Sequence, residues 1–600
     1  MSSSAVRPSA PLAYVSRPVL PAACRRAPDL MVYAGDAGGR CEVFAWHAGA
    51  GRARQVTDRA QGTMRCAIDP DGVIWWFAEE ADGTGAWRVQ GFEGGPDTPA
   101  FAGEIPPGRP AGLVLADNGR VAVGLGDGDG LTVRLGHRAA PVEHTLTFGG
   151  HATLAGMSPA GDLVAVARAA GSPHAVTVLT ADGETVARLS GERGRVWALG
   201  FAPGAPGAEL LLVEEHRDRY RLVTWTPERG AHRHAWCDFD TEITAHWFPE
   251  GRRVLIRQER HGRSRLAVAD LARHALTPLS VPEGTVQDAV ARADGAIHCL
   301  WTDTRTPARV ISVGGPAPRL PAPPPSPPPL TADTSDLWTP GPDGPVHTLL
   351  AVPPGRTAPG PVVFLVHGGP AHHDRDAYHP AVHSLIASGL AVARVNYRGS
   401  TGYGPRWRSA YGEGVGLTQA ADLAAVRRDL VARGIARPGA VGLWGTSWGG
   451  YLVLLALGLQ PELWRAGVAV KPIADYAAAY AQGTPALRAL DAGLFGGTPD
   501  EVPERYARSS PIGYADRVRA PLLVVAATRD PKCPPAQVHS YLAALRRADA
   551  PCEELWLDSG HDGLDGADHV LMLRRSLYFL ARELRSPRAR RPSPRDPERR

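Results

Sequence analysis

The sequence has almost no lysine, no paired cysteine motif and no long apolar run. Only two of its 65 basic residues are lysines, Lys471 and Lys532, a bias that we attribute to a GC-rich genome. The seven cysteines are scattered, with no CxxC pair and no Cys/His cluster at metal-ligand spacing. The start lacks an apolar signal core, and no 18 consecutive residues are apolar. We therefore expect reduced thiols, no metal, a cytoplasmic location and no membrane partner.

Most of the chain also lacks an excess of charge. The net charge of +4 arises at the C-terminal end, residues 585–600, where seven arginines accompany only two acidic residues. This segment has four prolines and almost no apolar side chains, so we predict a disordered basic tail. The remainder is nearly neutral, which argues against a nucleic-acid partner. No GxxxxGK[ST] motif is present to bind nucleotide phosphates, so we expect no cofactor.

What is present is enough apolar sequence for at least two folded domains. The 600 residues are 44% hydrophobic, which exceeds the needs of one ordinary core. Prolines crowd residues 314–330, where fixed φ angles and missing N–H donors exclude a helix or a central strand. We predict an N-terminal arm over 1–28, a first domain over 29–313, a stiff linker over 314–330 and a second domain over 331–584.

The first domain shows a repeat of short strands. Runs such as VIWWFAEE and RVLIRQER lie between turn signals whose glycines are 42 to 47 residues apart. Such a period without helical spacing is typical of a β-propeller, whose four-stranded blades bury their faces against their neighbours. The turn glycines are Gly72, Gly119, Gly161, Gly204, Gly251 and Gly295. Residues 29–49 lie one period earlier and predict a seventh blade; an irregular array of β-sandwiches is the alternative.

The second domain alternates strands with helices. PVVFLVHGG, GLAVARVNY, AVGLWG and APLLVVAATRD are strand-like, whereas LTQAADLAAVRRDLVARG and WGGYLVLLALGL have the spacing or the apolar content of helices. This alternation predicts a mostly parallel sheet with flanking helices, as in an α/β-hydrolase catalytic domain. Active groups in such sheets lie at the carboxyl ends of the strands.

One pentapeptide indicates a nucleophilic serine. Gly445-Thr446-Ser447-Trp448-Gly449 fits the G-x-S-x-G nucleophile elbow, in which the serine occupies a strained turn from a strand to a helix. The motif alone is weak because chance produces it easily in a glycine-rich chain. The apolar strand before it and the apolar helix after it supply the required context. We predict that Ser447 is the nucleophile.

A serine needs a base to take its proton and a carboxylate to orient that base. In this fold the chain order is serine, acid, histidine. Asp530 ends the strand APLLVVAATRD, and His561 follows the strand CEELWL in a glycine-flanked loop, so we predict these two as acid and base. The competing residues lack such placement: Asp558, Asp562 and Asp565 share the histidine's loop, and His539 and His569 fall in helical stretches.

The oxyanion of the intermediate needs preorganised N–H donors. One is expected to be the backbone N–H of Trp448, directly after the nucleophile. The second is expected from Gly368 and Gly369, in the turn HGGP that ends the strand VVFLV. A plain tight loop is the alternative for that turn.

Six stretches of the second domain resemble the prolyl oligopeptidase family, in its acylaminoacyl-peptidase-like branch. They are HGGP, NYRGSTGYG, GTSWGGY, RYARSSPIGYADRVRAPLLVV, DPKCPP and SGHDG, in that order. The resemblance implies the triad Ser447, Asp530 and His561, with HGGP as the oxyanion turn and the propeller as a cap over the site. Two departures concern the acid loop: AATRD stands where many members have a histidine-glycine pair, and Cys533 where valine is usual.

These features together predict a serine peptidase. It would hydrolyse short peptides or (acyl)aminoacyl amides through an acyl-enzyme, with access restricted by the propeller. An esterase or amidase that acts on a small aminoacylated natural product would use the same triad. A non-catalytic propeller scaffold is the third alternative, and assembly into a homo-oligomer stays open.

The residues that select the substrate are harder to identify. Trp448 and Tyr451 near the elbow are candidates for an apolar subsite, although core packing explains them equally well. Glu214 and Glu215 are candidates for binding the ammonium of a free N-terminus, as is the pair at residues 79–80, although each is also explained as an ordinary solvated pair.

Overall fold

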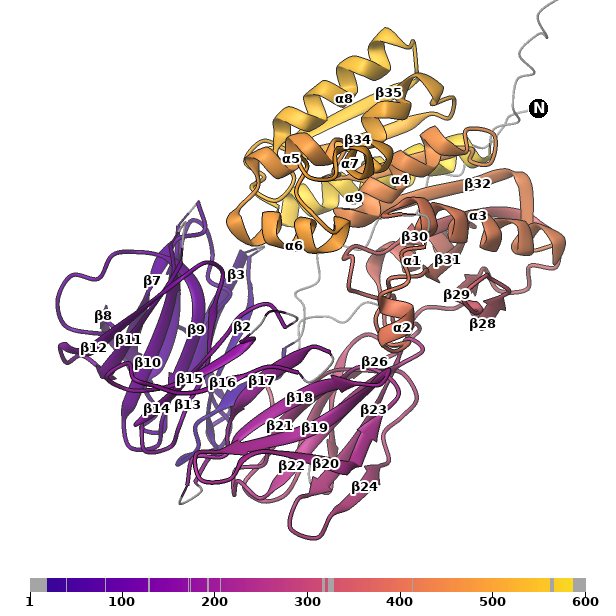
Figure 1. The fold of residues 1–600 in the computed structure, drawn as a ribbon. Coiled ribbons are helices and arrows are strands. Elements are labelled where there is room, and N and C mark those ends of the chain that lie inside the picture. Colours follow the sequence, from indigo (N-terminus) through magenta and orange to yellow (C-terminus); the bar gives the residue numbers. More distant parts are fainter. Residues whose placement is uncertain are drawn as a thin grey trace, which may run out of the picture.

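The computed structural model describes a β-propeller followed by an α/β-hydrolase domain (Figure 1). The described residues are 19–585 without residues 39, 81, 128–129, 171, 173, 192–193, 205–206, 316–318, 322–328, 413 and 562–565. Most of the predicted arm, much of the predicted linker and nearly all of the predicted tail therefore lie outside the described residues. None of the described helices is both long and apolar enough to cross a membrane.

The first three blades of the propeller are four-stranded antiparallel sheets. Their strands are β1 (Ala22–Ala23), β2 (Leu30–Ala37), β3 (Arg40–His47) and β4 (Arg52–Gln55); β5 (Cys66–Ile68), β6 (Ile74–Glu79), β7 (Gly85–Gly91) and β8 (Gly94–Pro99); and β9 (Arg109–Leu115), β10 (Arg120–Gly126), β11 (Gly130–His137) and β12 (Val142–Gly149). Because β1 pairs with β2 from within the predicted arm, we propose that the propeller begins at Ala22 rather than at residue 29.

Four more blades complete the propeller, of which the last has three strands among the described residues. Their strands are β13 (Thr153–Met157), β14 (Leu163–Ala167), β15 (Val176–Thr180) and β16 (Thr185–Leu189); β17 (Val196–Phe201), β18 (Leu210–His216), β19 (Arg219–Thr226) and β20 (Gly230–Phe239); β21 (Ile243–Trp247), β22 (Arg253–Arg260), β23 (Arg263–Asp270) and β24 (Ala275–Leu279); and β25 (Thr285–Ala291), β26 (Ile297–Thr302) and β27 (Arg309–Val313). The prediction of seven blades is confirmed, and the β-sandwich alternative is wrong.

The repeated glycines have a common structural role. Each of the six lies in the turn between the first and second strands of its blade, with φ between +66° and +86°, a region that glycine enters without a steric penalty. The first blade makes this turn without a glycine, between β1 and β2, and so lacks the marker. Apolar clusters lie between successive blades, which explains why inner strands such as β6 and β14 are buried on both faces.

The hydrolase domain is built on an eight-stranded sheet in the order β28-β29-β31-β30-β32-β33-β34-β35. From β31 through β35 neighbouring strands are parallel, while β28 and β29 pair antiparallel at one edge, so the predicted mostly parallel sheet is confirmed. The strands are β28 (Asp333–Thr339), β29 (Val346–Val352), β30 (Gly360–Val366), β31 (Ala391–Asn396), β32 (Ala436–Thr446), β33 (Ala466–Val470), β34 (Leu522–Ala527) and β35 (Cys552–Leu557).

Helices cover both faces of this sheet. Residues of α3, α4 and α8 form one apolar cluster with the sheet, and residues of α1 and α9 form another. The helices are α1 (Pro380–Ala387), α2 (Pro405–Arg408), α3 (Leu417–Ala432), α4 (Trp448–Leu459), α5 (Tyr476–Gln482), α6 (Pro485–Phe495), α7 (Pro503–Ser509), the 3-10 helix η1 (Pro511–Arg517), α8 (Pro535–Arg547) and α9 (Gly566–Arg585).

The loop of residues 396–404 in the hydrolase domain makes hydrogen bonds with the propeller. The carboxylate of Glu242, which follows β20, accepts hydrogen bonds from the Gly402 N–H at 2.6 Å and from the Tyr220 hydroxyl at 2.9 Å. Arg408 on α2 donates to the same Tyr220 hydroxyl at 2.6 Å. In Figure 1 the hydrolase domain lies above the propeller, with α2 next to it. The two domains thus meet through polar contacts at the carboxyl end of β31.

Candidate active site

The nucleophile elbow has the geometry that its motif predicts. Ser447 lies between β32 and α4 with φ of +59°, a conformation that a residue with a side chain rarely adopts. A Cβ atom on Gly449 would lie 2.0 Å from the Val366 carbonyl oxygen, and one on Gly445 would lie 2.3 Å from Gly449. Gly449 is required because the start of α4 packs against the end of β30 without room for a methyl group, and Gly445 because the end of β32 packs equally closely against Gly449.

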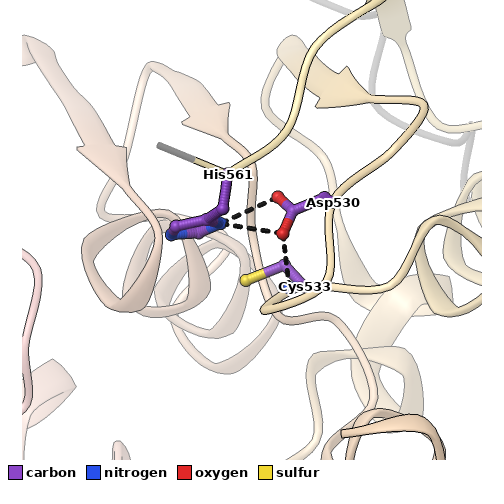
Figure 2. Close-up of side chains that lie close together, drawn as sticks. All are labelled: Asp530, Cys533 and His561. Carbon is purple, nitrogen blue, oxygen red and sulfur yellow. Dashed lines mark hydrogen bonds and ion pairs between the residues drawn. The ribbon is translucent and has the colours of Figure 1, made fainter. Parts of the chain in front are cut away.

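The structure brings the three predicted triad residues together. The Ser447 Oγ lies 3.0 Å from His561 Nε2, and His561 Nδ1 lies 2.8 Å from Asp530 Oδ2. Figure 2 shows the imidazole of His561 facing the carboxylate of Asp530. Ser447 follows β32, Asp530 follows β34 and His561 follows β35, so all three side chains come from the carboxyl ends of parallel strands in the same half of the sheet. This arrangement is sufficient to move a proton from the serine to the histidine.

Backbone groups of its own loop fix the orientation of the Asp530 carboxylate. Its Oδ1 accepts hydrogen bonds from the N–H groups of Lys532 at 2.9 Å and Cys533 at 2.8 Å. The side chain is buried, so water does not compete for these contacts. With Oδ1 engaged by the loop, Oδ2 is the closer acceptor for His561 Nδ1.

The predicted oxyanion donors lie beside Ser447. Trp448 is the first residue of α4, so its N–H has no acceptor within the helix. A Cβ atom on Gly368 would lie 3.3 Å from the Thr446 carbonyl oxygen, which shows how closely the HGGP turn approaches the elbow. The Tyr397 hydroxyl donates a hydrogen bond to the His367 carbonyl at 2.7 Å and so anchors this turn. The assignment of the Trp448, Gly368 and Gly369 N–H groups to the oxyanion stays a prediction.

The aromatic side chains of Trp448 and Tyr451 belong to the core. Tyr451 is fully buried and donates its hydroxyl to the Val415 carbonyl at 3.1 Å. The two rings pack edge-to-face at 5.1 Å, and both contact Tyr476. A fully enclosed ring offers no face to a substrate, so core packing, and not a subsite, accounts for Tyr451.

The two glutamates proposed to bind a substrate ammonium are held by arginines. Glu214 on β18 is buried and accepts from Arg233 Nε at 2.7 Å. Glu215 forms an ion pair with Arg408 of the hydrolase domain. Their carboxylates therefore serve the propeller and the domain interface, and the prediction that they bind substrate is not supported by the contacts they make. In the acidic pair at residues 79–80, the Glu80 carboxylate pairs with Arg59, which also donates to the backbone carbonyl of Glu79.

Lys471 is a feature of the site that the sequence analysis missed. It follows β33 and is buried, with its Nζ donating to the carbonyl oxygens of Gly560 at 2.6 Å and His561 at 2.8 Å. The ammonium thus holds the backbone of the loop that carries the histidine. The one signal in the sequence was rarity, since a chain with only two lysines places one of them directly after an apolar strand.

We expect Lys471→Met to lower kcat by about tenfold or more with little change in KM, because a histidine loop released by about 1 Å loses its alignment with Ser447. The rate at which a fluorophosphonate labels Ser447 should fall in parallel, since labelling uses the same base. Lys471→Arg keeps a cation that donates to carbonyl oxygens and should restore part of both rates. Equal labelling rates in all three proteins would contradict a positioning role.

Comparison with known proteins identifies the family of the second domain. Residues 378–587, which contain Ser447, Asp530 and His561, match the model of the prolyl oligopeptidase family. This part of the chain belongs to the prolyl oligopeptidase family. The resemblance predicted from the short motifs is thereby confirmed.

Curated relatives of the family match over the same part of the chain. Dipeptidyl peptidase family member 6 of Caenorhabditis elegans is 29% identical over 36% of this chain and 30% of its own length. The human acylamino-acid-releasing enzyme is 30% identical over 33% of this chain and 28% of its own length. The matched segment thus spans less than a third of each relative.

The likeness of the fold extends over both domains. A puromycin-hydrolyzing peptidase of Mycobacterium tuberculosis superposes with a TM-score of 0.74, covering 96% of this chain and 98% of that one at 21% identity. At this identity the match establishes the shared architecture of a propeller followed by a hydrolase domain.

Proposed function

We propose that the chain is a serine hydrolase that cleaves short peptides or (acyl)aminoacyl amides through an acyl-enzyme. The observation that carries this proposal is the continuous hydrogen-bonded line from Ser447 Oγ through His561 to Asp530. Family membership of residues 378–587 supports it independently. All seven cysteines carry free thiols, which supports a reducing compartment such as the cytoplasm.

The reaction follows from the geometry of the site. His561 Nε2 accepts the Ser447 proton while Oγ attacks the carbonyl carbon of the substrate, and Asp530 stabilises the imidazolium that forms. The oxyanion receives hydrogen bonds from the Trp448 N–H and the HGGP turn. His561 then protonates the leaving amine, which leaves an ester on Ser447. Water, activated by the same imidazole, hydrolyses this ester and restores the enzyme.

Access to the site is restricted by the propeller in this proposal. His373, just after the HGGP turn, lies with its Nε2 3.7 Å from the Glu259 carboxylate of β22, and its Nδ1 lies 2.8 Å from Thr401 Oγ1. The propeller therefore contacts the segment that follows the oxyanion donors. We propose that such contacts hold the propeller over the site, so that short or flexible chains reach Ser447 and folded proteins do not.

Asp491 is the residue that we propose to recognise a free amino group on the substrate. It lies on α6, one turn before Phe495, which packs against Tyr476 at 5.0 Å between ring centres. Tyr476 in turn contacts Trp448, the residue after the nucleophile. Unlike Glu214 and Glu215, the Asp491 carboxylate has no hydrogen bond or ion pair with any residue that the structure describes.

The electrostatics of Asp491 support this proposal. Burial raises the pKa of the Asp491 carboxyl to about 7. Burial and then the Asp491 carboxylate raise the pKa of the Tyr506 hydroxyl, and Asp491 also contributes, after burial and Asp530, to the raised pKa of the Cys533 thiol. Asp491 is partly buried, and a carboxylate in such a place that pairs with no described residue gains most from a cationic ligand, because each favours the charged form of the other. The α-ammonium of a peptide or aminoacyl amide is such a ligand.

Matched substrates test two parts of the proposal: that the protein hydrolyses amides, and that it recognises a free amino group. Steady-state kinetics on free-amine and N-acetyl forms of the same aminoacyl p-nitroanilide, with longer blocked peptides as a third class, establish hydrolysis and its preference. An aminoacylated natural product such as puromycin belongs in the panel, since a neighbour in fold is a puromycin-hydrolyzing peptidase. Failure of every amide, together with failure of a fluorophosphonate to label Ser447, would leave only the scaffold alternative.

We expect Asp491→Asn to raise KM for the free-amine substrate by about tenfold to a hundredfold, the value of one charge-assisted hydrogen bond, and to leave the N-acetyl substrate unaffected. In the wild type, the ratio of free-amine to N-acetyl kcat/KM should rise from about pH 6 to about pH 7.5 as Asp491 ionises through its raised pKa of about 7, while most of the substrate keeps its α-ammonium proton. The N-acetyl substrate corrects for every ionisation of the enzyme that affects both substrates. This rise should vanish in the variant. Asp500→Asn, in the loop after α6, serves as the control, and an unchanged ratio in Asp491→Asn contradicts the assignment.

A further inference from the structure

A thiol lies within the candidate active site and takes no part in the proposed reaction. Cys533 Sγ, one oxygen of Asp530 and one ring nitrogen of His561 all lie within 4.8 Å of one another. Figure 2 shows the sulfur of Cys533 near both the imidazole of His561 and the carboxylate of Asp530. The Cys533 side chain is buried.

These three groups form a set of ligands for a soft or borderline divalent cation. Thiolate, imidazole and carboxylate are the ligand types that Zn²⁺ takes in proteins, and thiolate selects strongly for thiophilic ions such as Cd²⁺. Around a tetrahedral zinc ion, ligands at about 2.0 to 2.3 Å from the metal lie roughly 3.3 to 3.8 Å apart. The ligand atoms of this cluster therefore need shifts of only about 1 Å to enclose such an ion.

We propose that Asp530, Cys533 and His561 form an inhibitory site for Zn²⁺ and other thiophilic divalent cations. Binding replaces the thiol proton, which leaves to solvent, by a metal–sulfur bond, and it occupies a lone pair of the imidazole. Whichever ring nitrogen binds the metal, His561 no longer accepts the Ser447 proton while held by Asp530. The fourth position of a tetrahedral ion falls to the Ser447 oxygen or to water. The hydrolase is thus switched off reversibly by the free metal concentration.

The protonation state of the thiol explains how the two functions coexist. Burial, together with the Asp530 carboxylate, raises the pKa of the Cys533 thiol well above its ordinary value. Without metal the thiol is therefore neutral, and it neither competes with Ser447 as nucleophile nor adds a charge beside the triad. Metal binding must displace this proton, so affinity rises with pH.

The test separates the site from the proposed function by using a readout that needs no activity. Cd²⁺ titrated into the full-length protein should produce a thiolate-to-metal charge-transfer band in the ultraviolet that saturates at one ion per chain. The band should persist in Cys552→Ala, a partly buried cysteine of the same domain, and disappear in Cys533→Val. In His561→Gln the affinity for Cd²⁺ should fall by about tenfold or more.

Inhibition is the second readout, and it alone rests on the proposed function. Zn²⁺ should inhibit the wild type and Cys552→Ala reversibly, with recovery on adding EDTA, while Cys533→Val needs at least about tenfold more metal. The rate of each variant with metal is compared with the rate of the same variant without metal. If Cys533→Val fails to fold, Cys533→Ala takes its place. A wild type that lacks hydrolase activity but still shows the Cys533-dependent band would refute the proposed hydrolase function and support the metal site. A band or inhibition of equal strength in Cys533→Val overturns the site.

Discussion

Ser447→Ala is expected to remove hydrolysis of every amide and ester substrate, with a loss of about 10⁴-fold or more in kcat. The loss is this large because the serine oxygen is the atom that forms the acyl-enzyme, and alanine leaves His561 without a proton to accept. Any hydrolysis that remains faster than the uncatalysed reaction in water would come from the oxyanion donors and substrate binding. Steady-state kinetics on the substrate panel and labelling by a fluorophosphonate measure the effect.

The control for this prediction is Ser540→Ala, an exposed serine of α8 whose hydroxyl contacts only its own helix at Ala536. It should retain both turnover and labelling. Thermal unfolding of both variants should match the wild type, since the Ser447 hydroxyl contributes one partly exposed hydrogen bond. A Ser447→Ala protein that still hydrolyses the panel would assign the reaction to another residue.

The fold was predictable because its signals are local. In the propeller a glycine with positive φ closes the first turn of six blades, so its spacing carries the blade repeat. The first blade makes the same turn without glycine and was recognised only from its strands. Its short first strand, β1, was missed because a two-residue strand leaves no pattern.

The triad was predictable for a different reason. In a parallel sheet the carboxyl ends of strands converge, so residues far apart in sequence meet if each follows its strand. Ser447, Asp530 and His561 each do so, and a motif or a strand end marks all three. Their catalytic roles remain predictions that the substitutions above and below test.

The remaining parts of the site depend on packing that the sequence does not display. The sequence gives Glu215 the appearance of an exposed acid, because its ion-pair partner Arg408 lies 193 residues away in the chain. The sequence equally does not show that Asp491 has no ion pair or hydrogen bond with any described residue, because this depends on which side chains surround it in the fold. Lys471 contacts a loop about ninety residues further on, and only the fold shows which carbonyl oxygens it reaches.

Asp530→Asn is expected to lower kcat by about 10⁴-fold, nearly as much as loss of the nucleophile, although the change is isosteric. The structure explains the size of this effect. The N–H groups of Lys532 and Cys533 both donate to Oδ1, so the asparagine must keep its carbonyl oxygen there and turn its NH₂ toward His561. Nδ1 then becomes the acceptor, the ring proton moves to Nε2, and Ser447 faces a donor instead of a base.

Asp558→Asn is the matched control, because this exposed aspartate lies on the same loop as the histidine and contacts Arg529 and the Thr528 hydroxyl. It should retain activity within about threefold, as expected for an exposed ion pair. Folding of Asp530→Asn is checked by thermal unfolding. The rate that remains in Asp530→Asn should increase with pH as hydroxide replaces the missing base, while KM stays within a few-fold of wild type. A modest loss in Asp530→Asn, matching that of Asp558→Asn, would show that another group orients His561.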